Sequence, residues 1–300
     1  MKMAAPPVTL CIRPASQGAK NDREKDMSKK VSPTGKTVVI TGAASGIGRS
    51  LARQLADAGA SLVITDINTE GLAAVADELS AKGTKVSAPV VDMGDFAAVD
   101  AFADEAVKDA GDSLAFVFAN AGIHGVTPAI DPDLDMFEKV MRINLMGPVH
   151  MSKAFVPRLM ARGGPAQLVI TGSQASFLAA PGIAPYVAAK HGVWGFADSL
   201  RIELAMKGSD VGVSVVAPSR VDTSITRGRI EEYRAQGGDK AVEDYIASMA
   251  GPDAIAEVII RESQKRVFWI IPSHEPTLEM FKARAQAIID AMPAGEIKLA

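Results

Sequence analysis

Cysteine is almost absent from this sequence, since Cys11 is the single one among 300 residues. An intrachain disulfide is therefore impossible, which suits a reducing compartment and leads us to expect a cytoplasmic protein. Long hydrophobic runs are also missing: no apolar stretch approaches the ~18 residues that a membrane-spanning helix needs. We therefore expect no membrane association.

An excess of charge of one sign is missing as well. The formal net charge is −3, so the chain lacks the basic character of a nucleic-acid-binding protein. No group of His, Cys and acidic residues has metal-ligand spacing, and we predict no metal site. What is plentiful is hydrophobic material, at 48% of the residues, which is enough for a large core.

The first 34 residues differ from the rest of the chain. They hold several prolines and a run of mixed charges, and residues 1–34 are therefore predicted to be a flexible leader. Their apolar part is short and interrupted by prolines, which argues against a signal peptide. Three nearby acidic residues disfavour an organellar transit peptide, and Met27 is a candidate for the physiological start.

Residues 37–66 have the pattern of a dinucleotide-binding unit. A β-branched run over residues 37–41 predicts a buried strand, and it is followed by Gly42, Gly46, Gly48 and an amphipathic helix. Such glycines let backbone N–H groups approach a pyrophosphate at the helix N-terminus. An ordinary strand-to-helix turn is the alternative interpretation of the glycines alone.

Asp66 ends the second apolar run of this unit, 18 residues after Gly48. At the carboxyl end of a strand, a carboxylate can accept hydrogen bonds from both ribose hydroxyl groups of adenosine. It would repel a 2′-phosphate, and the sequence therefore predicts NAD rather than NADP.

Apolar runs and helical periodicity alternate along the rest of the chain. This alternation predicts an α/β fold, a doubly wound parallel sheet of the Rossmann type with helices on both faces. Further strands are predicted over residues 85–91, 114–119, 167–171, 211–217 and 267–271. Helices are predicted over residues 69–82, 95–109, 134–162, 186–207, 252–261 and 275–292, with kinks at Pro148 and Pro157.

We predict a single dehydrogenase domain over residues 35–272 and a C-terminal helical extension over residues 273–300. Residues 219–250 break the strand–helix rhythm with many charges and few apolar anchors. They follow a strand's carboxyl end, where a substrate lid is expected. A solvated surface helix and loop is the alternative.

Tyr186 and Lys190 lie one helical turn apart and share a face. An ammonium group beside a phenol lowers the pKa of the phenol, which makes Tyr186 a usable acid or base near pH 7. Ser173 follows the predicted strand 167–171 and can donate a hydrogen bond to the same substrate oxygen.

With these residues in view, the chain resembles the short-chain dehydrogenase/reductase family. The resemblance covers residues 35 to about 272 and implies a nicotinamide cofactor and hydride transfer between an alcohol and a carbonyl group. One departure is Pro218-Ser219, where the family has Pro-Gly. The matching motifs are TGAASGIG (41–48), NAG (120–122), NLMG (144–147), YVAAK (186–190) and APSRVDT (217–223).

The resemblance implies roles for individual residues. Tyr186 matches the general acid/base, Lys190 the residue that holds the nicotinamide ribose and tunes Tyr186, and Ser173 the residue that polarises the substrate oxygen. Asn144 matches the residue that holds a water in the proton relay. The implied cofactor-binding residues are Gly42, Ser45, Gly46, Ile47, Gly48, Asp66, Asp92, Met93, Asn120, Tyr186, Lys190 and Thr223.

The substrate is expected to be an alcohol or ketone. The C-terminal stretch resembles the ends of bacterial dehydrogenases for benzylic alcohols of lignin-derived aryl ethers, which suggests a bulky, hydrophobic substrate. His124 is read as an ordinary loop histidine that flanks the site. The predicted substrate-contacting residues are Ser173, Gln174, Phe177 and Tyr186, with Ile183 and His124 beside them.

The family packs the helices beginning near Leu134 and Tyr186 across two-fold axes, so we expect a homodimer or homotetramer. Small residues on the second helix permit close approach there, or packing within one chain. The sequence as a whole predicts an NAD(H)-dependent alcohol dehydrogenase or ketone reductase. The alternatives are an epimerase or dehydratase on the same fold, or a non-catalytic module that senses NAD. The small residues are Ala188, Ala189, Gly192 and Gly195.

Overall fold

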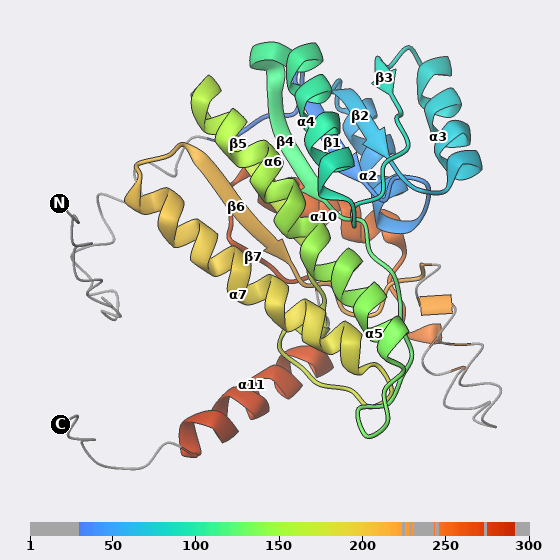
Figure 1. The fold of residues 1–300 in the computed structure, drawn as a ribbon, viewed down its shortest axis with the longest axis vertical. Helices are drawn as coiled ribbons and strands as arrows, with labels where there is room; N and C mark the ends of the chain where they lie inside the picture. The colour runs from blue at the N-terminus through green and yellow to red at the C-terminus, as the bar shows by residue number, and fades with distance from the viewer. Residues whose placement is uncertain are drawn as a thin grey trace.

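The computed structural model describes residues 30–223, 226, 227, 230, 243, 246–272 and 275–291. Its centre is a seven-stranded sheet in the order β3-β2-β1-β4-β5-β6-β7, in which every neighbouring pair is parallel (Figure 1). This confirms the predicted α/β fold. The strand order reverses between β1 and β4, and that switch point is where such sheets bind ligands. The strands are β1 (Thr37–Thr41), β2 (Ser61–Thr65), β3 (Val86–Ser87), β4 (Leu114–Ala119), β5 (Ala166–Thr171), β6 (Val211–Val216) and β7 (Trp269–Ile270).

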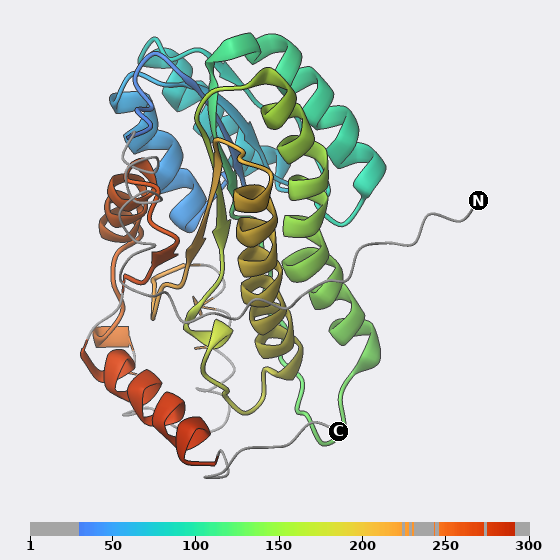
Figure 2. The same cartoon turned by 90° about the vertical axis from the view of Figure 1, so that its left-hand side faces the viewer.

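Helices cover both faces of the sheet, as Figure 2 shows edge-on. Helices α2, α3 and α10 pack on one face, and α4, α6 and α7 pack on the other. Because both faces are covered, β1 and β4 are buried along their whole length rather than alternating between buried and exposed residues. The helices are α2 (Gly46–Asp57), α3 (Thr69–Ala81), α4 (Phe96–Ala110), α5 (Leu134–Met141), α6 (Gly147–Arg162), α7 (Ala184–Met206), α10 (Pro252–Gln264) and α11 (Glu275–Asp290).

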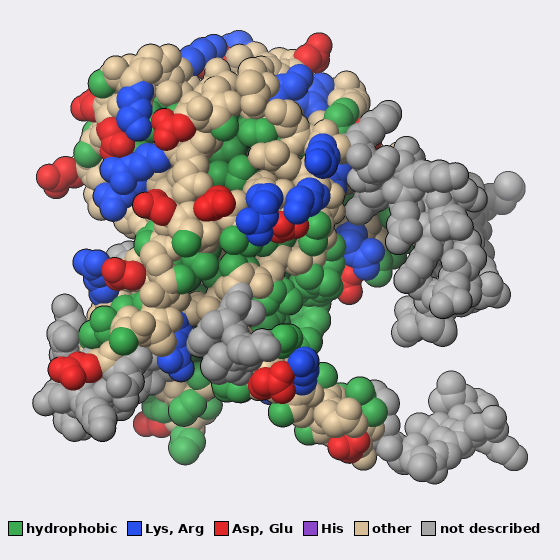
Figure 3. Space-filling view, turned by 180° about the vertical axis from the view of Figure 1, so that it is seen from behind, with side chains coloured by type: hydrophobic (Ala, Val, Ile, Leu, Met, Phe, Trp, Pro, Cys, Tyr) green, Lys and Arg blue, Asp and Glu red, His purple; other side chains and the backbone are tan. Residues whose placement is uncertain are grey.

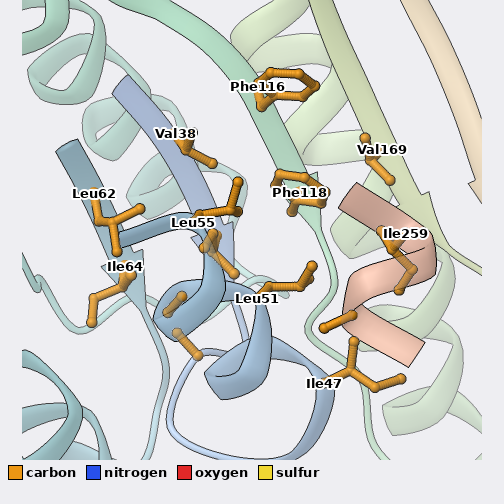
Figure 4. Close-up of a cluster of buried hydrophobic side chains, with 14 of the residues drawn as sticks. Val38, Ile47, Leu51, Leu55, Leu62, Ile64, Phe116, Phe118, Val169 and Ile259 are labelled. Carbon is orange, nitrogen blue, oxygen red and sulfur yellow. The ribbon is translucent and has the colours of Figure 1, made fainter. Parts of the chain in front are cut away.

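The core on the α2 side seats the glycine turn. Leu51 and Leu55 of α2 lie among side chains of β1, β2 and β4, and Phe116 and Phe118 stack on the same side (Figure 4). Leu51 is fully buried, so the first turns of α2 have a fixed position against the sheet. This packing aims the N-terminus of α2 at the carboxyl ends of the strands.

Two edge strands are shorter than predicted. The strand expected over residues 85–91 is only Val86–Ser87, and the strand expected over 267–271 is only Trp269–Ile270. Each lies at an edge of the sheet and pairs with one neighbour over two residues. Pro89 follows β3 and has no N–H to donate to a ladder, which limits the strand on that side.

The helix predicted over residues 134–162 consists of three segments. A π-helical turn over Arg142–Met146 separates α5 from α6. Pro148 lies in the first turn of α6, where its missing N–H is not needed, so it begins a segment instead of kinking one. π-turns mark functional sites in many helices, and this one contains Asn144.

The predicted leader, lid and C-terminal extension are described only in part. Of the predicted leader, residues 1–29 are outside the described residues, but Val31 is buried and its N–H donates to the carbonyl of Gln264 (3.0 Å). Most of the predicted lid over residues 219–250 is also outside the described residues. Helix α11 lies beyond the carboxyl ends of the strands (Figures 1 and 2). Among the described residues, no helix is long and apolar enough to cross a membrane.

The surface carries both signs of charge. On the face seen in Figure 3, lysines and arginines are interspersed with acidic side chains over the upper half, and hydrophobic side chains gather below them towards α11. Several of the ion pairs are exposed, such as Lys108 with Glu105 and Lys282 with Glu279. Pairs of this kind contribute at most about 1 kcal/mol each to stability.

Candidate active site

The glycine turn between β1 and α2 has a geometry that only glycine allows. Gly42 has φ +69°, and a Cβ there would lie 2.8 Å from the Cα of Ala121. Gly46 has φ +52°, and its Cβ would lie 3.0 Å from Cγ2 of Thr223. A Cβ on Gly48 would overlap the carbonyl oxygen of Gly42. The first two glycines therefore shape the turn, whereas the third lets α2 pack directly on it.

The turn opens onto a groove of about 320 Å³. Helix α2 has Ser45 as its N-cap, and the side chain of Ser45 makes no capping hydrogen bond. Its first N–H groups can therefore receive a pyrophosphate, which fits a dinucleotide in this groove. Gly48 is buried behind the turn and does not line the groove. Of the predicted cofactor residues, those that line it are Gly42, Ser45, Gly46, Ile47, Asp66, Asn120, Tyr186, Lys190 and Thr223.

A side cavity of about 130 Å³ continues from Asp66 and holds the predicted pair Asp92 and Met93. Burial raises the pKa of Asp92, but the N–H of Gly94 and the guanidinium of Arg142 (2.9 Å) more than offset this and hold the pKa below its ordinary value. Asp92 is thus an anion already paired with a cation. Ile67, which the sequence analysis missed, lines both cavities and is 64% exposed.

The carboxylate of Asp66 is fixed by main-chain donors. Its Oδ2 accepts from the N–H of Ala44 (3.0 Å), and its Oδ1 accepts from the N–H of Asn68 (2.9 Å). Asp66 therefore has a defined position at the carboxyl end of β2 and at the junction of the two cavities.

Asn120 ties three strands together at the same edge. Its Nδ2 donates to the carbonyl of Thr41 at the end of β1, and its Oδ1 accepts from Oγ1 of Thr171 at the end of β5 (both 3.1 Å). Oγ1 of Thr41 accepts from the N–H groups of Asn120 and Ala121 (2.9 Å each). The floor of the groove is thus a hydrogen-bonded unit.

Ser173, Tyr186 and Lys190 all line the groove. Ser173 lies two residues after β5, and Tyr186 and Lys190 come from α7, whose first residue is Ala184. The Nζ of Lys190 lies 5.7 Å from the centroid of the Tyr186 ring. Lys190 is 3% exposed, and burial lowers its pKa to about 8.

Asn144 is buried in the π-turn and contacts the loop after β4. Its Oδ1 accepts from the N–H of Ile123, and its Nδ2 donates to the carbonyl of the same residue (2.8 Å each). The adjacent Gly122 has little space for a side chain, because a Cβ there would lie 3.2 Å from Oδ1 of Asn144 and 3.8 Å from Nζ of Lys190. The amide therefore holds the loop beside Lys190.

A further cavity of about 210 Å³ adjoins the groove, and Ser173 and Tyr186 line both. Gln174, Ile183 and His124, which the sequence analysis named as substrate-contacting or neighbouring residues, also line it. The ring of His124 lies beside the phenol of Tyr186, with 5.9 Å between the two ring centroids. His124 is therefore part of the site and not only a residue of a nearby loop. The sequence analysis missed the remaining lining residues, which are Ala175, Leu178, Ala179, Ala180, Ser219, Arg220, Thr226 and Met280.

The structure differs from the prediction at Phe177. This side chain is 4% exposed and does not line the cavity. Its ring contacts Phe281 of α11 at 4.7 Å and Trp194 of α7 at 6.0 Å between centroids. Trp194 in turn contacts Trp269 of β7 at 4.8 Å. Phe177 thus belongs to an aromatic row that docks α11 on the domain.

A comparison with known proteins agrees with this geometry. Residues 36–234 match the family model described as short chain dehydrogenase. The chain belongs to the short-chain dehydrogenase family. Members of this family bind a nicotinamide cofactor and transfer hydride between alcohol and carbonyl groups, and this chain is an oxidoreductase of that kind.

This short-chain dehydrogenase is similar in sequence to a dehydrogenase from Streptomyces, and in structure to two solved proteins. It is 44% identical over 213 residues to 1-deoxy-11-beta-hydroxypentalenate dehydrogenase of Streptomyces avermitilis, covering 70% of this chain and 78% of the relative. It is 28% identical to a short-chain dehydrogenase/reductase from Burkholderia phymatum in complex with NAD, with a TM-score of 0.78 over 90% of this chain and 100% of that one. LigD from Sphingobium sp. strain SYK-6, in its apo form, is 26% identical, with a TM-score of 0.74 over 87% and 99%.

Proposed function

We propose that the protein is an NAD(H)-dependent dehydrogenase of secondary alcohols, or reductase of the corresponding ketones, with Tyr186 as the general acid/base. The observation that carries this proposal is the position of Ser173 and Tyr186, which line both the cofactor groove and the adjoining cavity. A substrate oxygen between them borders the groove that Lys190 and Thr223 also line.

When bound, the nicotinamide supplies a hydride acceptor or donor at its C4 carbon. In the oxidation direction, the Tyr186 phenolate takes the proton of the substrate hydroxyl while the hydride leaves the carbinol carbon. Ser173 donates a hydrogen bond to the same oxygen and holds it as its charge changes. In reduction, Tyr186 returns the proton to the developing alkoxide.

Lys190 supports Tyr186 in two ways. Its positive charge lies 5.7 Å from the centroid of the Tyr186 ring and stabilises the phenolate form. Its hydrogen bond to the carbonyl of Thr171 (2.7 Å) fixes it against the end of β5. We assign Asn144 to the positioning of the loop that borders Lys190, because both ends of its amide bind Ile123.

We infer NAD rather than NADP as the cofactor because of Asp66. A fixed carboxylate at the end of β2 accepts hydrogen bonds from ribose hydroxyls and repels a phosphate at the 2′ position. The main-chain donors to both of its oxygens fix its position at the end of β2. The NAD complex of the Burkholderia phymatum relative supports the same choice.

We infer a bulky substrate with an apolar body. Much of the cavity beyond Tyr186 is lined by aliphatic side chains, among them Leu178, Ile183 and Met280. A relative named as a dehydrogenase of a hydroxypentalenate supports a secondary alcohol on a large carbon skeleton.

The direct test replaces Tyr186 with phenylalanine. Turnover of a panel of secondary alcohols and ketones is expected to fall at least about 10³-fold, since the proton path is removed. Binding of NADH, followed by its fluorescence, is expected to change less than about threefold. Unchanged turnover in this variant would contradict the assignment. Tight NADH binding by the wild type with no turnover across the panel would favour an NAD-sensing module.

We also propose that the protein works in the cytoplasm as a homodimer or homotetramer that assembles through α5 and α7. Ala188 and Gly195 support this, because they lie exposed on α7 at a spacing of seven residues and therefore share a face. Light scattering of Gly195→Arg tests it: a smaller assembly than the wild type is expected, and an unchanged mass would exclude this face.

A further inference from the structure

We propose that Gln174 is a specificity residue of the substrate cavity, and that the substrate carries a second oxygen atom besides the one that reacts. The side-chain amide of Gln174 donates a hydrogen bond to this second oxygen. The inference rests on the proposed function and specifies the substrate class of the same site.

The first argument is the side of the site on which Gln174 lies. Gln174 directly follows Ser173 and lines the cavity of about 210 Å³ that also contains Ser173 and Tyr186. It does not line the groove of about 320 Å³ or the side cavity next to Asp66. Its side chain therefore contacts the substrate rather than the cofactor.

The second argument is that the main chain fixes the position of Gln174. The residue begins a short 3₁₀ turn, Gln174–Ser176, whose N-cap is Ser173. Its N–H donates to the carbonyl of Pro218 after β6, and its carbonyl accepts from the N–H of Leu178 (both 2.9 Å). The turn thus holds Gln174 and the catalytic serine in a set relation to each other.

The third argument is that the side-chain amide has one end bound and the other end available. Oε1 of Gln174 accepts from Oγ1 of Thr277 on α11 (3.4 Å). Nε2 makes no hydrogen bond to any residue that the structure describes. The side chain is half-buried, but Nε2 is not among the fully enclosed polar atoms. Its N–H donors are therefore accessible at the cavity that Gln174 lines.

The available donor selects among substrates because of the wall around it. Leu178, Ile183 and Met280 give the cavity aliphatic surface, so an apolar substrate body displaces water from it. A donor that loses its water without gaining an acceptor costs about 1–3 kcal/mol. The cavity therefore discriminates against substrates that place only hydrocarbon beside Nε2 of Gln174.

Together these observations describe a cavity that contacts a substrate at three places. Ser173 and Tyr186 bind the reacting oxygen, aliphatic side chains contact the body, and Gln174 binds the second oxygen. The amide is uncharged, so a neutral oxygen is a sufficient acceptor. The substrate class is a secondary alcohol or ketone that also carries an ether, hydroxyl or carbonyl oxygen.

The test begins with binding, which needs no turnover. Calorimetry would compare the 2-, 3- and 4-methoxycyclohexanones with the matching ethylcyclohexanones, which have CH₂ in place of the ether oxygen. Saturating NAD⁺ fills the groove and cannot reduce a ketone. The wild type is expected to bind at least one methoxy isomer about 5- to 10-fold more tightly than its ethyl partner, as a neutral hydrogen bond does. Gln174→Met is expected to lose this preference. Gln174→Glu is expected to reverse it, because a carboxylate repels an ether oxygen.

Turnover then gives an independent readout. The substrates are the methoxycyclohexanols and ethylcyclohexanols of the same substitution patterns, oxidised with NAD⁺. The wild type is expected to favour the same methoxy isomer in kcat/KM by about fivefold or more, mainly through KM. In Gln174→Met this preference disappears, while kcat/KM for the ethyl compounds and the affinity for NAD⁺ change less than about threefold.

Gln286→Met is the matched control, since Gln286 is an exposed glutamine of α11 that lines none of these cavities. It is expected to behave as the wild type. Equal binding of every methoxy and ethyl pair by the wild type, or an unchanged preference in both Gln174→Met and Gln174→Glu, would overturn the inference. A methoxy preference that these variants lose, with no turnover of any alcohol or ketone, would support the amide contact and count against the proposed function instead.

Discussion

The ammonium nitrogen of Lys190 lies 2.7 Å from the carbonyl oxygen of Thr171, the last residue of β5. This bond joins α7 to the strand end that leads into Ser173. Lys190 is buried, and desolvation lowers its pKa to about 8. The charged ammonium group that the chemistry needs therefore lowers the free energy of unfolding. Catalytic electrostatics and stability are therefore opposed at this residue.

The stability of the protein should depend on pH through Lys190. Its pKa of about 8 in the folded protein lies below its value of 10.5 in an unfolded chain, so the unfolded chain binds more protons between these two values. The free energy of unfolding should accordingly rise with pH in this range, by about 3 kcal/mol. Below pH 8 the buried ammonium imposes its full cost, and above pH 10.5 it imposes none.

Denaturant unfolding at pH 7 to 10.5 measures this effect. The comparison is Tyr186→Phe against Tyr186→Phe with Lys190→Met, so that the phenol does not contribute. The difference in unfolding free energy should shift in favour of the lysine-containing variant as pH rises. A difference independent of pH would mean that the buried lysine does not titrate in this range.

Replacing Asp66 with alanine should relax the cofactor preference. It removes the charge that repels a 2′-phosphate and the acceptor for the ribose hydroxyls, so the ratio of kcat/KM for NAD⁺ over NADP⁺ should fall by about tenfold or more. Steady-state kinetics with one alcohol and both cofactors gives this ratio. Asp57→Ala, an exposed acid at the far end of α2, is the control and should leave the ratio unchanged. Equal use of both cofactors by the wild type would refute the role of Asp66.

Gly48→Ala should damage both the fold and the cofactor groove. The new Cβ would overlap the carbonyl oxygen of Gly42, and backbone atoms cannot rotate away as a side chain can. A loss of about 3 kcal/mol of unfolding free energy is expected, with weaker NADH binding. Gly251→Ala is the control, because its φ is −66° and nothing lies within 4 Å of an added Cβ. Its effect should stay within about 1 kcal/mol.

Phe281→Ala should loosen α11 without unfolding the domain. The ring of Phe281 packs on Phe177, and Oγ1 of Thr277 donates to Oε1 of Gln174 (3.4 Å). Loss of about 1–2 kcal/mol of docking energy should speed amide exchange in α11 by about 5- to 30-fold. Phe96→Ala, a half-buried phenylalanine at the start of α4, should leave exchange in α11 unchanged. Unaltered exchange in Phe281→Ala would mean that other contacts hold this helix.

The parts of the site that the sequence predicted are those encoded by short spacings. Three glycines between a strand and a helix, an acid after the next strand, and a tyrosine four residues before a lysine define local geometry wherever they occur. The sheet then brings the ends of β1, β2, β4 and β5 to one edge, as its parallel topology requires. All of these residues except Gly48 accordingly line one groove.

The parts that the sequence did not predict depend on distant contacts. Phe177 flanks Ser173 in sequence, but its ring turns to Phe281, more than a hundred residues later. Met280 and Arg220 reach the substrate cavity only because α11 and the segment after β6 fold back over it. The lengths of β3 and β7 were overestimated because edge strands need a partner on one side only, and apolar runs do not reveal where that pairing stops.

The two hydrogen bonds between Asn144 and Ile123 restrict which side chain position 144 can hold. One end of the side chain must accept a proton from an amide, and the other must offer one to a carbonyl, at a fixed separation. Aspartate has the right shape, but one of its carboxylate oxygens would face the carbonyl oxygen of Ile123. Leucine would remove both hydrogen bonds that this side chain makes to the main chain of Ile123. Among side chains of this length, only asparagine offers both an acceptor and a donor. The π-helical turn between α5 and α6 therefore requires asparagine at position 144.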